Sequence, residues 1–294
     1  MRFLEILCNF TALFKQYKCQ NYLCGEITTK FLNIQTIFWF SVLYYLIKFV
    51  FFLIMTKLSV NINKIATIRN SRGGNTPDVL KAAIDVQEFG AHGVTVHPRP
   101  DERHIKYKDV YEIRRIIKTE FNIEGYPSPK FMELVKSVRP HQVTLVPDPP
   151  EAITSSSGWD TINNLSFLQD IIGELKEYGI RTSIFIDTNP DFIVNAAKTN
   201  TDRVELYTEP YASGFEKDPE KAIAPFVEAA NIANKSGVSI NAGHDLNLQN
   251  LKFFNEKIPF LKEVSIGHAL ISDALYLGLE RTISMYKELL VKNK

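Results

Sequence analysis

Eight short apolar segments recur along the chain from residue 58 onward, and each ends in or beside a polar or ionisable residue. They are Leu58–Asn63, Gly93–His97, Asn122–Glu124, Gln142–Val146, Thr182–Asp187, Arg203–Tyr207, Val238–Asn241 and Val264–Gly267. Nearly every gap between them carries an amphipathic helical pattern, as in Tyr107–Thr119 and Pro219–Ser236. Strands that alternate with helices predict a parallel sheet. Eight such units predict an α/β fold, a closed (β/α)8 TIM barrel with extra helices.

Polar side chains gather where these predicted strands end. They are Asn61, Asn63, His97, Arg99, Glu124, Asp187, Glu205, His244 and His268. In barrels of this kind the C-terminal ends of the strands face the active site. We therefore expect these side chains to form a catalytic rim at one end of the barrel.

The composition of the chain changes near Met55. The only cysteines, Cys8, Cys19 and Cys24, lie upstream, so disulfides cannot stabilise the barrel and a reducing, cytoplasmic location fits. Residues 55–294 match the usual length of one barrel domain, about 250 residues. Subtracting the upstream residues leaves 34 − 5 = 29 basic and 33 − 2 = 31 acidic side chains. This balance gives no basic excess that would favour nucleic acid.

Residues 1–54 form a hydrophobic N-terminal segment whose status is open. The run Ile34–Met55, interrupted by Lys48, is long enough to span a bilayer, which takes about 20 apolar residues. The first predicted strand begins at Leu58, so a membrane helix would leave no linker before the barrel. Met55 can also serve as the true start. We expect an incorrectly assigned start upstream of Met55, and a membrane anchor is the alternative.

Two features at the rim indicate binding of anions. The Asn241-Ala242-Gly243-His244 loop and the Gly267-His268 helix start follow the last two strands, the usual phosphate site of such barrels. Glycine lets the backbone approach a phosphate, and a helix N-terminus offers free N–H groups. A second anion could be bound by arginines on the first two loops, although single loop arginines are usually solvated. These arginines are Arg69, Arg72, Arg99 and Arg103.

The rim also carries candidates for proton transfer. Glu124 and Glu205 lie in strands that are otherwise largely apolar, where burial raises the pKa of a carboxyl group and makes it a proton acceptor near neutral pH. A buried ion pair with an arginine is an equally good interpretation of both. Four histidines at the same end favour proton transfer. They are His97, His104, His244 and His268, whereas His92 and His141 precede strands and are expected to be structural.

Other classes of chemistry have less support. A zinc hydrolase barrel would usually show two histidines flanking one residue after the first strand, where this chain has Asn61-Ile62-Asn63. No cysteine follows Met55, so a cysteine nucleophile is excluded there. Lys64 is the only lysine at a strand end, which gives a lysine Schiff base little support.

Several motifs follow one another along the predicted barrel. They are Val60-Asn61-Ile62, Ile65–Asn70, Arg72-Gly73, Gly93–His97 with Arg99 and Arg103-His104, Asn122–Glu124, Leu145–Pro147, Phe185–Asp187, Asn241–His244 and Ile266–Ala269. Each motif is weak alone, but in this order they are specific. From about Leu58 to Leu290 the chain resembles the pyridoxine 5'-phosphate synthase family of vitamin B6 biosynthesis.

The resemblance implies a reaction without metal or cofactor. In it 1-deoxy-D-xylulose 5-phosphate condenses with 3-amino-2-oxopropyl phosphate to pyridoxine 5'-phosphate, with loss of inorganic phosphate and water. The substrate itself supplies the amine, which agrees with the missing barrel lysine. The resemblance also implies a cytoplasmic homo-oligomer, typically an octamer. The alternatives are another phosphosugar isomerase or aldolase on the same barrel, or a membrane-tethered binding protein.

The resemblance also implies roles for individual residues. His97 and Glu124 would be proton acceptors, His244 a proton donor, and Glu205 would stabilise charge in the transition states. The substrate-binding residues would be Asn61 and Arg72 for the aminoacetone phosphate, Arg99, His104 and Thr154 for the deoxyxylulose phosphate, and Gly267 and His268 for phosphate.

The chain departs from the family pattern at two places in this site. The family often has Asp-His where this chain has Asn63-Lys64, and Lys64 could still contact sugar hydroxyls or phosphate. The family often has glycine where this chain has Asp245, and an acid beside a phosphate is unfavourable unless it points away. All three residues are kept as substrate-binding candidates.

Overall fold

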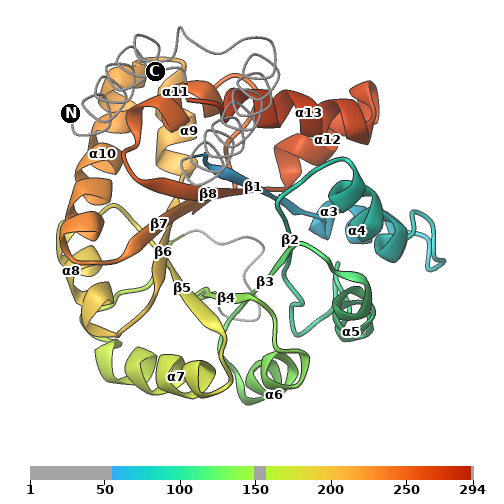
Figure 1. Ribbon diagram of the computed structural model, residues 1–294, viewed down its shortest axis with the longest axis horizontal. Helices are drawn as coiled ribbons and strands as arrows, with labels where there is room; N and C mark the ends of the chain where they lie inside the picture. Colours follow the sequence, from blue (N-terminus) through green and yellow to red (C-terminus); the bar gives the residue numbers. More distant parts are fainter. Residues whose placement is uncertain (1–54, 149–156, 293–294) are drawn as a thin grey trace, which may run out of the picture. The chain divides into compact units, whose positions relative to one another are not determined.

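The computed structural model describes residues 55–148 and 157–292 (Figure 1). The expectations for residues 1–54 and for Thr154 therefore concern residues outside the described part of the chain. Among the described residues, no helix combines the length and the apolar character that crossing a bilayer requires.

Eight parallel strands close into a barrel in the order β1-β2-β3-β4-β5-β6-β7-β8, which confirms the predicted TIM-barrel fold. Their bounds are β1 Lys57–Asn61, β2 Gly93–Val96, β3 Glu120–Gly125, β4 Gln142–Leu145, β5 Arg181–Ile186, β6 Arg203–Tyr207, β7 Ser239–Gly243 and β8 Leu261–Ile266. Each strand begins and ends within a few residues of its predicted place.

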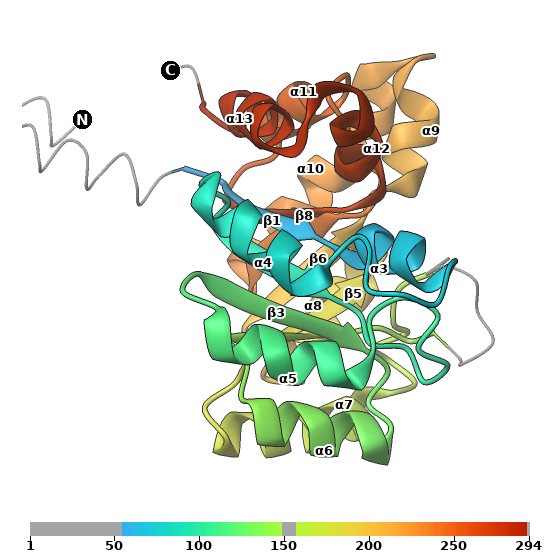
Figure 2. The ribbon, with the colours of Figure 1, turned by 90° about the vertical axis from the view of Figure 1, so that its right-hand side faces the viewer.

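Helices surround the strands in Figure 1. Their bounds are α3 Asn63–Asn70, α4 Val79–Glu88, α5 Tyr107–Ile116, α6 Pro129–Val138, α7 Leu165–Glu177, α8 Pro190–Lys198, α9 Glu209–Phe215, α10 Pro219–Lys235, α11 Leu251–Lys257, α12 His268–Leu277 and α13 Leu279–Leu289. Side chains cap several of the starts: Asp78, Ser128 and Asp218 each accept the N–H three residues on. In Figure 2 the arrow of β3 runs toward the end of the barrel at which α3 lies.

The interior of the barrel is polar, which is unusual because branched apolar residues dominate most barrels of this kind. Alternate residues of each strand point inward. Ser59 and Thr95 share a hydrogen bond there, and Gln142 donates to Asn122. At the N-terminal end Arg203 pairs with Glu263, and Arg181 pairs with Glu120. The intervening apolar residues face the helices and form the hydrophobic core. They include Val60, Val94, Ile123, Val143, Ile184, Val204, Ile240 and Val264.

The structure differs from the sequence pattern at four places. The first strand ends at Asn61, two residues early, and residues 63–70 are helical where a loop was expected from Arg69. The next helix begins at Val79, two residues after Pro77, because Asp78 caps it. The last predicted helix is two helices, since Gly278 at their junction adopts φ +81°, a conformation that favours glycine.

Arg69 does not serve the anion site predicted from its position. Its guanidinium lies on α3 and binds both oxygens of the buried Asp109 carboxylate, at 2.7 and 2.8 Å. We expect Asp109→Asn to lower the free energy of unfolding by about 3 kcal/mol, because it leaves a buried arginine without its counter-charge. Urea unfolding measures this. Asp85→Asn removes an exposed pair with Lys81 and should change stability by less than about 1 kcal/mol. Equal effects of the two variants would contradict the prediction.

Candidate active site

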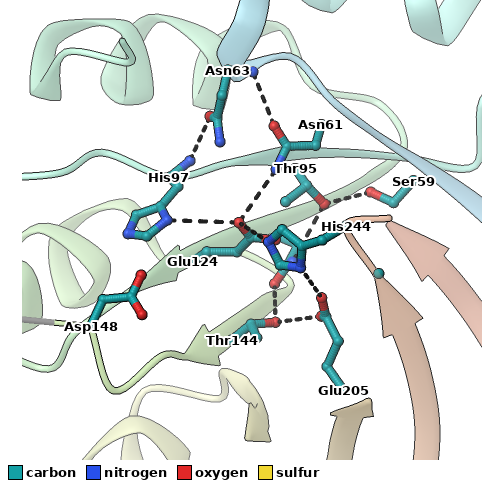
Figure 3. Close-up of polar contacts among 12 residues, drawn as sticks. Ser59, Asn61, Asn63, Thr95, His97, Glu124, Thr144, Asp148, Glu205 and His244 are labelled. Carbon is teal, nitrogen blue, oxygen red and sulfur yellow. Dashed lines mark hydrogen bonds and ion pairs between the residues drawn. The ribbon is translucent and has the colours of Figure 1, made fainter. Parts of the chain in front are cut away.

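Four predicted catalytic side chains lie together at the C-terminal end of the barrel (Figure 3). Glu124 on β3 is at their centre: its Oε2 lies 3.9 Å from His97 Nδ1 and 3.9 Å from His244 Nε2. Glu205 on β6 lies on the other side of His244, with 3.9 Å between Oε1 and Nδ1. Residues more than 100 positions apart in the sequence thus form one cluster of acids and imidazoles.

The environment of Glu124 favours its protonated form. Burial, then the charges of Glu205 and Asp148, raise the pKa of its carboxyl group well above the ordinary value, and Arg99 opposes them. Its Oε1 is buried without a hydrogen-bond partner in the described part of the chain. The alternative interpretation, an ion pair with an arginine, finds no support for Glu124, because its ion-pair contacts in the described part of the chain are the two histidines.

The two imidazoles are held neutral. Burial, followed by the charge of Arg99, lowers the pKa of His97 well below its ordinary value. Burial lowers the pKa of His244 to about 4, although Asp148 raises it. A neutral imidazole can accept a proton, and the nearby Glu124 carboxyl group can supply one. The cluster therefore combines neutral imidazoles, which can act as bases, with a carboxyl group whose raised pKa favours its protonated form.

Amide side chains fix the positions of His97 and Glu124. The backbone N–H of His97 donates to Asn63 Oδ1 at 2.9 Å, and the N–H of Asn63 donates to Asn61 Oδ1 at 3.0 Å. Asn61 then turns its Nδ2 to Glu124 Oε2 at 3.3 Å. Because each amide oxygen accepts a backbone N–H, the oxygen and nitrogen positions of both amide groups are defined. Two predicted substrate-binding residues thus also position the catalytic cluster.

Glu205 is buried against β7. Burial, then the charge of Glu263, raises its pKa to about 8, and the Thr144 hydroxyl opposes this from 3.5 Å. Gly243 permits the approach, because a Cβ there would lie 2.6 Å from Glu205 Oε1 and 2.9 Å from the Ser265 carbonyl oxygen. The next residue, His244, has φ +85°, a strained conformation for a side chain of this kind that is typical of functional sites.

The contact between Gly243 and Glu205 gives a testable prediction. We expect Gly243→Ala to lower kcat about a hundredfold, because the added methyl group displaces the Glu205 carboxylate by an ångström or more. Gly173→Ala is the matched control, since a Cβ at this helical position meets nothing within 4 Å. Steady-state kinetics of both variants measure the effect. Normal kcat in Gly243→Ala would show that Glu205 has no positional role.

Arg99 and His104 lie on the β2 side of the cluster. Arg99 Nη2 donates to Asp148 Oδ2 at 2.7 Å, and both side chains are buried. The His104 ring lies 6.0 Å from the His97 ring, between centroids. His104 Nδ1 accepts the N–H of Ile105, so the neutral ring carries its proton on Nε2. Burial, then the charge of Arg99, lowers the pKa of His104 to about 4.

The predicted phosphate site lies beside Asn61. Gly267 is the N-cap of α12, and a Cβ there would lie 3.1 Å from Asn61 Cβ, so a larger residue would crowd Asn61. His268 begins the helix and is exposed. Asp245 is half-buried, and its N–H donates to the Thr208 hydroxyl. Burial, then the charge of Glu209, raises the pKa of Asp245, which weakens its repulsion of a phosphate.

Two other predicted substrate-binding residues are exposed. Arg72 follows the end of α3, and Lys64 lies in the first turn of α3. His92 and His141 are structural, as expected, because their Nδ1 atoms accept the backbone N–H groups of Leu58 and Phe121. Among the described residues, no group of three His, Cys, Asp or Glu side chains is arranged to hold a metal ion.

Sequence reasoning missed two residues of the site. Thr144 contacts Glu205 from inside the barrel, and threonine on a strand carries no signal of such a contact. Asp148 follows the end of β4 and pairs with Arg99. The rule that selected the other strand-end residues could have found Asp148, because β4 ends at Leu145, three residues earlier.

Comparison with known proteins places this site in a family. The family model of pyridoxal phosphate biosynthesis protein PdxJ matches residues 58–292. The pyridoxine 5'-phosphate synthase of Bacteroides thetaiotaomicron is 64% identical over 236 residues, which are 80% of this chain and 100% of that protein. The protein of the same name from Porphyromonas gingivalis is 58% identical over 234 residues, 80% of this chain and 98% of that protein.

Solved structures share the fold at low identity. A tryptophan synthase structure from Mycobacterium tuberculosis is 12% identical with a TM-score of 0.56, and covers 82% of this chain and 94% of its own. The tryptophan synthase α-subunit of Pyrococcus furiosus is 15% identical with a TM-score of 0.52, and covers 80% and 97%. These similarities support the barrel fold alone.

Proposed function

The chain belongs to the family of pyridoxal phosphate biosynthesis protein PdxJ, and we propose that it is a synthase that condenses 1-deoxy-D-xylulose 5-phosphate with 3-amino-2-oxopropyl phosphate to pyridoxine 5'-phosphate, inorganic phosphate and water. The observation that carries the proposal is the 64% identity with a pyridoxine 5'-phosphate synthase over that protein's whole length. The geometry of the site agrees with it, because ring closure with loss of water needs several proton carriers.

The acid–base cluster suits repeated proton transfers. Neutral His97 accepts a proton as the substrate amine attacks the ketone carbon, and His244 protonates the departing hydroxyl group. Before it acts as a base, Glu124 must lose its own proton, and His244 Nε2, which lies 3.9 Å away as does His97 Nδ1, can receive it. This transfer yields a carboxylate base and an imidazolium donor together, the roles assigned to these residues. Glu205, beside His244, stabilises charge in the transition states.

Two phosphate groups need two binding regions. The N-terminus of α12 at Gly267 and His268, with Asn61 beside it, suits the aminoacetone phosphate because free N–H groups and the helix dipole favour an anion. Arg99 and His104 suit the deoxyxylulose phosphate from the β2 side, and Arg99 can give paired hydrogen bonds. Arg72, Lys64, Asn63 and Asp245 complete the proposed binding residues, and Thr154 would join them from outside the described residues.

A direct assay tests the proposal. The purified chain is incubated with both phosphates, and pyridoxine 5'-phosphate and inorganic phosphate are measured by mass spectrometry and a colorimetric assay. We expect both products in equal amounts, and neither when either substrate is omitted. Failure of the folded protein to form pyridoxine 5'-phosphate from fresh substrates would reject the proposal. Conversion of the deoxyxylulose phosphate alone would instead indicate an isomerase or aldolase.

The assembly and location of the protein are part of the same proposal. We infer a cytoplasmic homo-octamer, as the family resemblance implies. The exposed apolar pair Leu275 and Tyr276 on α12, 70% and 90% exposed, supports an interface between copies. Sedimentation should give a mass near eight times that of one chain, and a monomer at micromolar concentration would reject the octamer.

A further inference from the structure

A third carboxylate lies at the catalytic cluster, and neither the sequence motifs nor the proposed reaction gives it a role. Asp148 follows β4 and is 7% exposed. Figure 3 shows its carboxylate on the side of the site where His97 and Glu124 lie. Together with His97, Arg99, Gly125 and Tyr126 it lines a small cavity of about 40 Å³. An acid at this position loses hydration, so its presence needs a compensating interaction.

Arg99 supplies that interaction. Arg99 Nη2 lies 2.7 Å from Asp148 Oδ2, and the two side chains are 5% and 6% exposed, so they form a buried ion pair. Such a pair is costly to desolvate and contributes little net stability, and an apolar pair of similar size would often be as stable. A charge pair buried beside an acid–base cluster therefore calls for an explanation in terms of the reaction.

We propose that Asp148 is a positioning residue of this reaction: its carboxylate holds the Arg99 guanidinium beside His97 and supplies the negative charge that retains a proton within the Glu124–His244 pair. The inference rests on the proposed function, because it assigns Asp148 a part in the same proton transfers. The Asp148 charge acts on both partners in one direction, since a nearby anion disfavours the Glu124 carboxylate and favours the His244 imidazolium.

The surrounding charges are consistent with this role. Asp148 contributes to the raised pKa of Glu124, and its charge raises the pKa of His244 against the effect of burial. Arg99 lowers the pKa of Glu124, so the two charges of the buried pair have opposite effects on the cluster. The other titratable groups facing this region are His97, Arg103 and His104 from the β2 side, Asp187 after β5, Glu205 and Tyr207 on β6, and Glu209 and Asp245 beyond β6 and β7.

The test compares three variants. Asp148→Asn removes the charge at almost constant volume, and Asp148→Glu keeps it. Asp109→Asn is the matched control, because it breaks another buried Arg–Asp pair, with Arg69, that does not contact the cluster. The readouts are the pH dependence of kcat/KM and the titration of His244, followed by proton NMR and assigned by its loss in His244→Gln.

We expect both limbs of the pH profile to move to lower pH by about one unit in Asp148→Asn. Both limbs move in the same direction, because the substitution removes a negative charge and leaves the positive charge of Arg99 without its partner. Each of these changes lowers the pKa of every group in the cluster. The NMR titration of His244 should move in the same direction. Asp148→Glu should restore the wild-type profile, and Asp109→Asn should keep it while losing stability.

An unchanged pH profile and His244 titration in folded Asp148→Asn would overturn the proposal and leave Asp148 a structural role. If that variant does not fold, Asp148→Ser removes the same charge with a smaller side chain, and the same two outcomes apply. The His244 titration needs no substrate. It therefore tests Asp148 even if the wild-type chain forms no pyridoxine 5'-phosphate, which would reject the proposed function instead.

Discussion

Glu124→Gln is expected to reduce kcat at least about a hundredfold, the usual contribution of a positioned acid–base group. Glutamine keeps the volume of the side chain, and its carbonyl oxygen can still accept the hydrogen bond from Asn61 Nδ2. The amide can neither take up nor release a proton between His97 and His244, from each of which Glu124 Oε2 is separated by 3.9 Å. Steady-state kinetics with both substrates measure the loss.

The fold and the binding of substrates serve as controls for this variant. We expect an unchanged circular dichroism spectrum and affinities for the single substrates within a few-fold of the wild-type values. Glu112→Gln, which removes a partly exposed carboxylate paired with Lys108 on the outer helix α5, should keep full activity. If Glu124→Gln retained a tenth or more of the wild-type kcat, Glu124 would not be a proton carrier in the rate-limiting step.

Glu205→Gln is expected to stabilise the protein as the pH rises. The pKa of this buried carboxyl group is raised from 4.5 to about 8 in the folded state. A carboxyl group with a raised pKa contributes stability that is fully present below its unfolded pKa and is lost as the pH rises through the folded pKa. Wild-type stability therefore falls between about pH 4.5 and pH 8, whereas glutamine carries no such penalty.

The difference in unfolding free energy between variant and wild type should grow over this pH range to about 3–5 kcal/mol. The shift from 4.5 to about 8 sets the upper end of this value. Urea unfolding at pH 5 and pH 8 measures it, with the exposed Glu256→Gln as control. We also expect Glu205→Gln to lose activity, because active sites commonly keep residues that lower the stability of the fold but are needed for function. A difference that does not change with pH would contradict the raised pKa.

The strands of this barrel could be predicted from the sequence because each combines an apolar outer face with polar residues at its end. The same rule located His97, Glu124 and His244, which the structure brings together. The short helix Asn63–Asn70 was missed because its sequence is mostly polar and buries only Ala66 and Arg69. Helices of this length take most of their stability from tertiary packing, which the sequence pattern does not reveal.

Charge partners were the least predictable part of the site. Arg69 and Arg99 look alike in the sequence, as arginines near the ends of the first two strands. The structure separates them, because Arg69 pairs with Asp109 on α5, and Arg99 pairs with Asp148 at the catalytic cluster. Their partners are 40 and 49 positions away along the chain. Spacing patterns within one element cannot report contacts over such separations.

The polar interior of the barrel separates the part of the protein that stabilises it from the part that performs its chemistry. The hydrophobic free energy of folding comes from the layer between strands and helices, where Val204 and Ile240 are fully buried. Exchanging inward residues such as Ser59, Thr95 or Asn122 for other hydrogen-bonding side chains leaves that layer intact. Design or natural variation can therefore replace the inward-facing residues beneath the catalytic cluster without reducing the hydrophobic contribution to the stability of the fold.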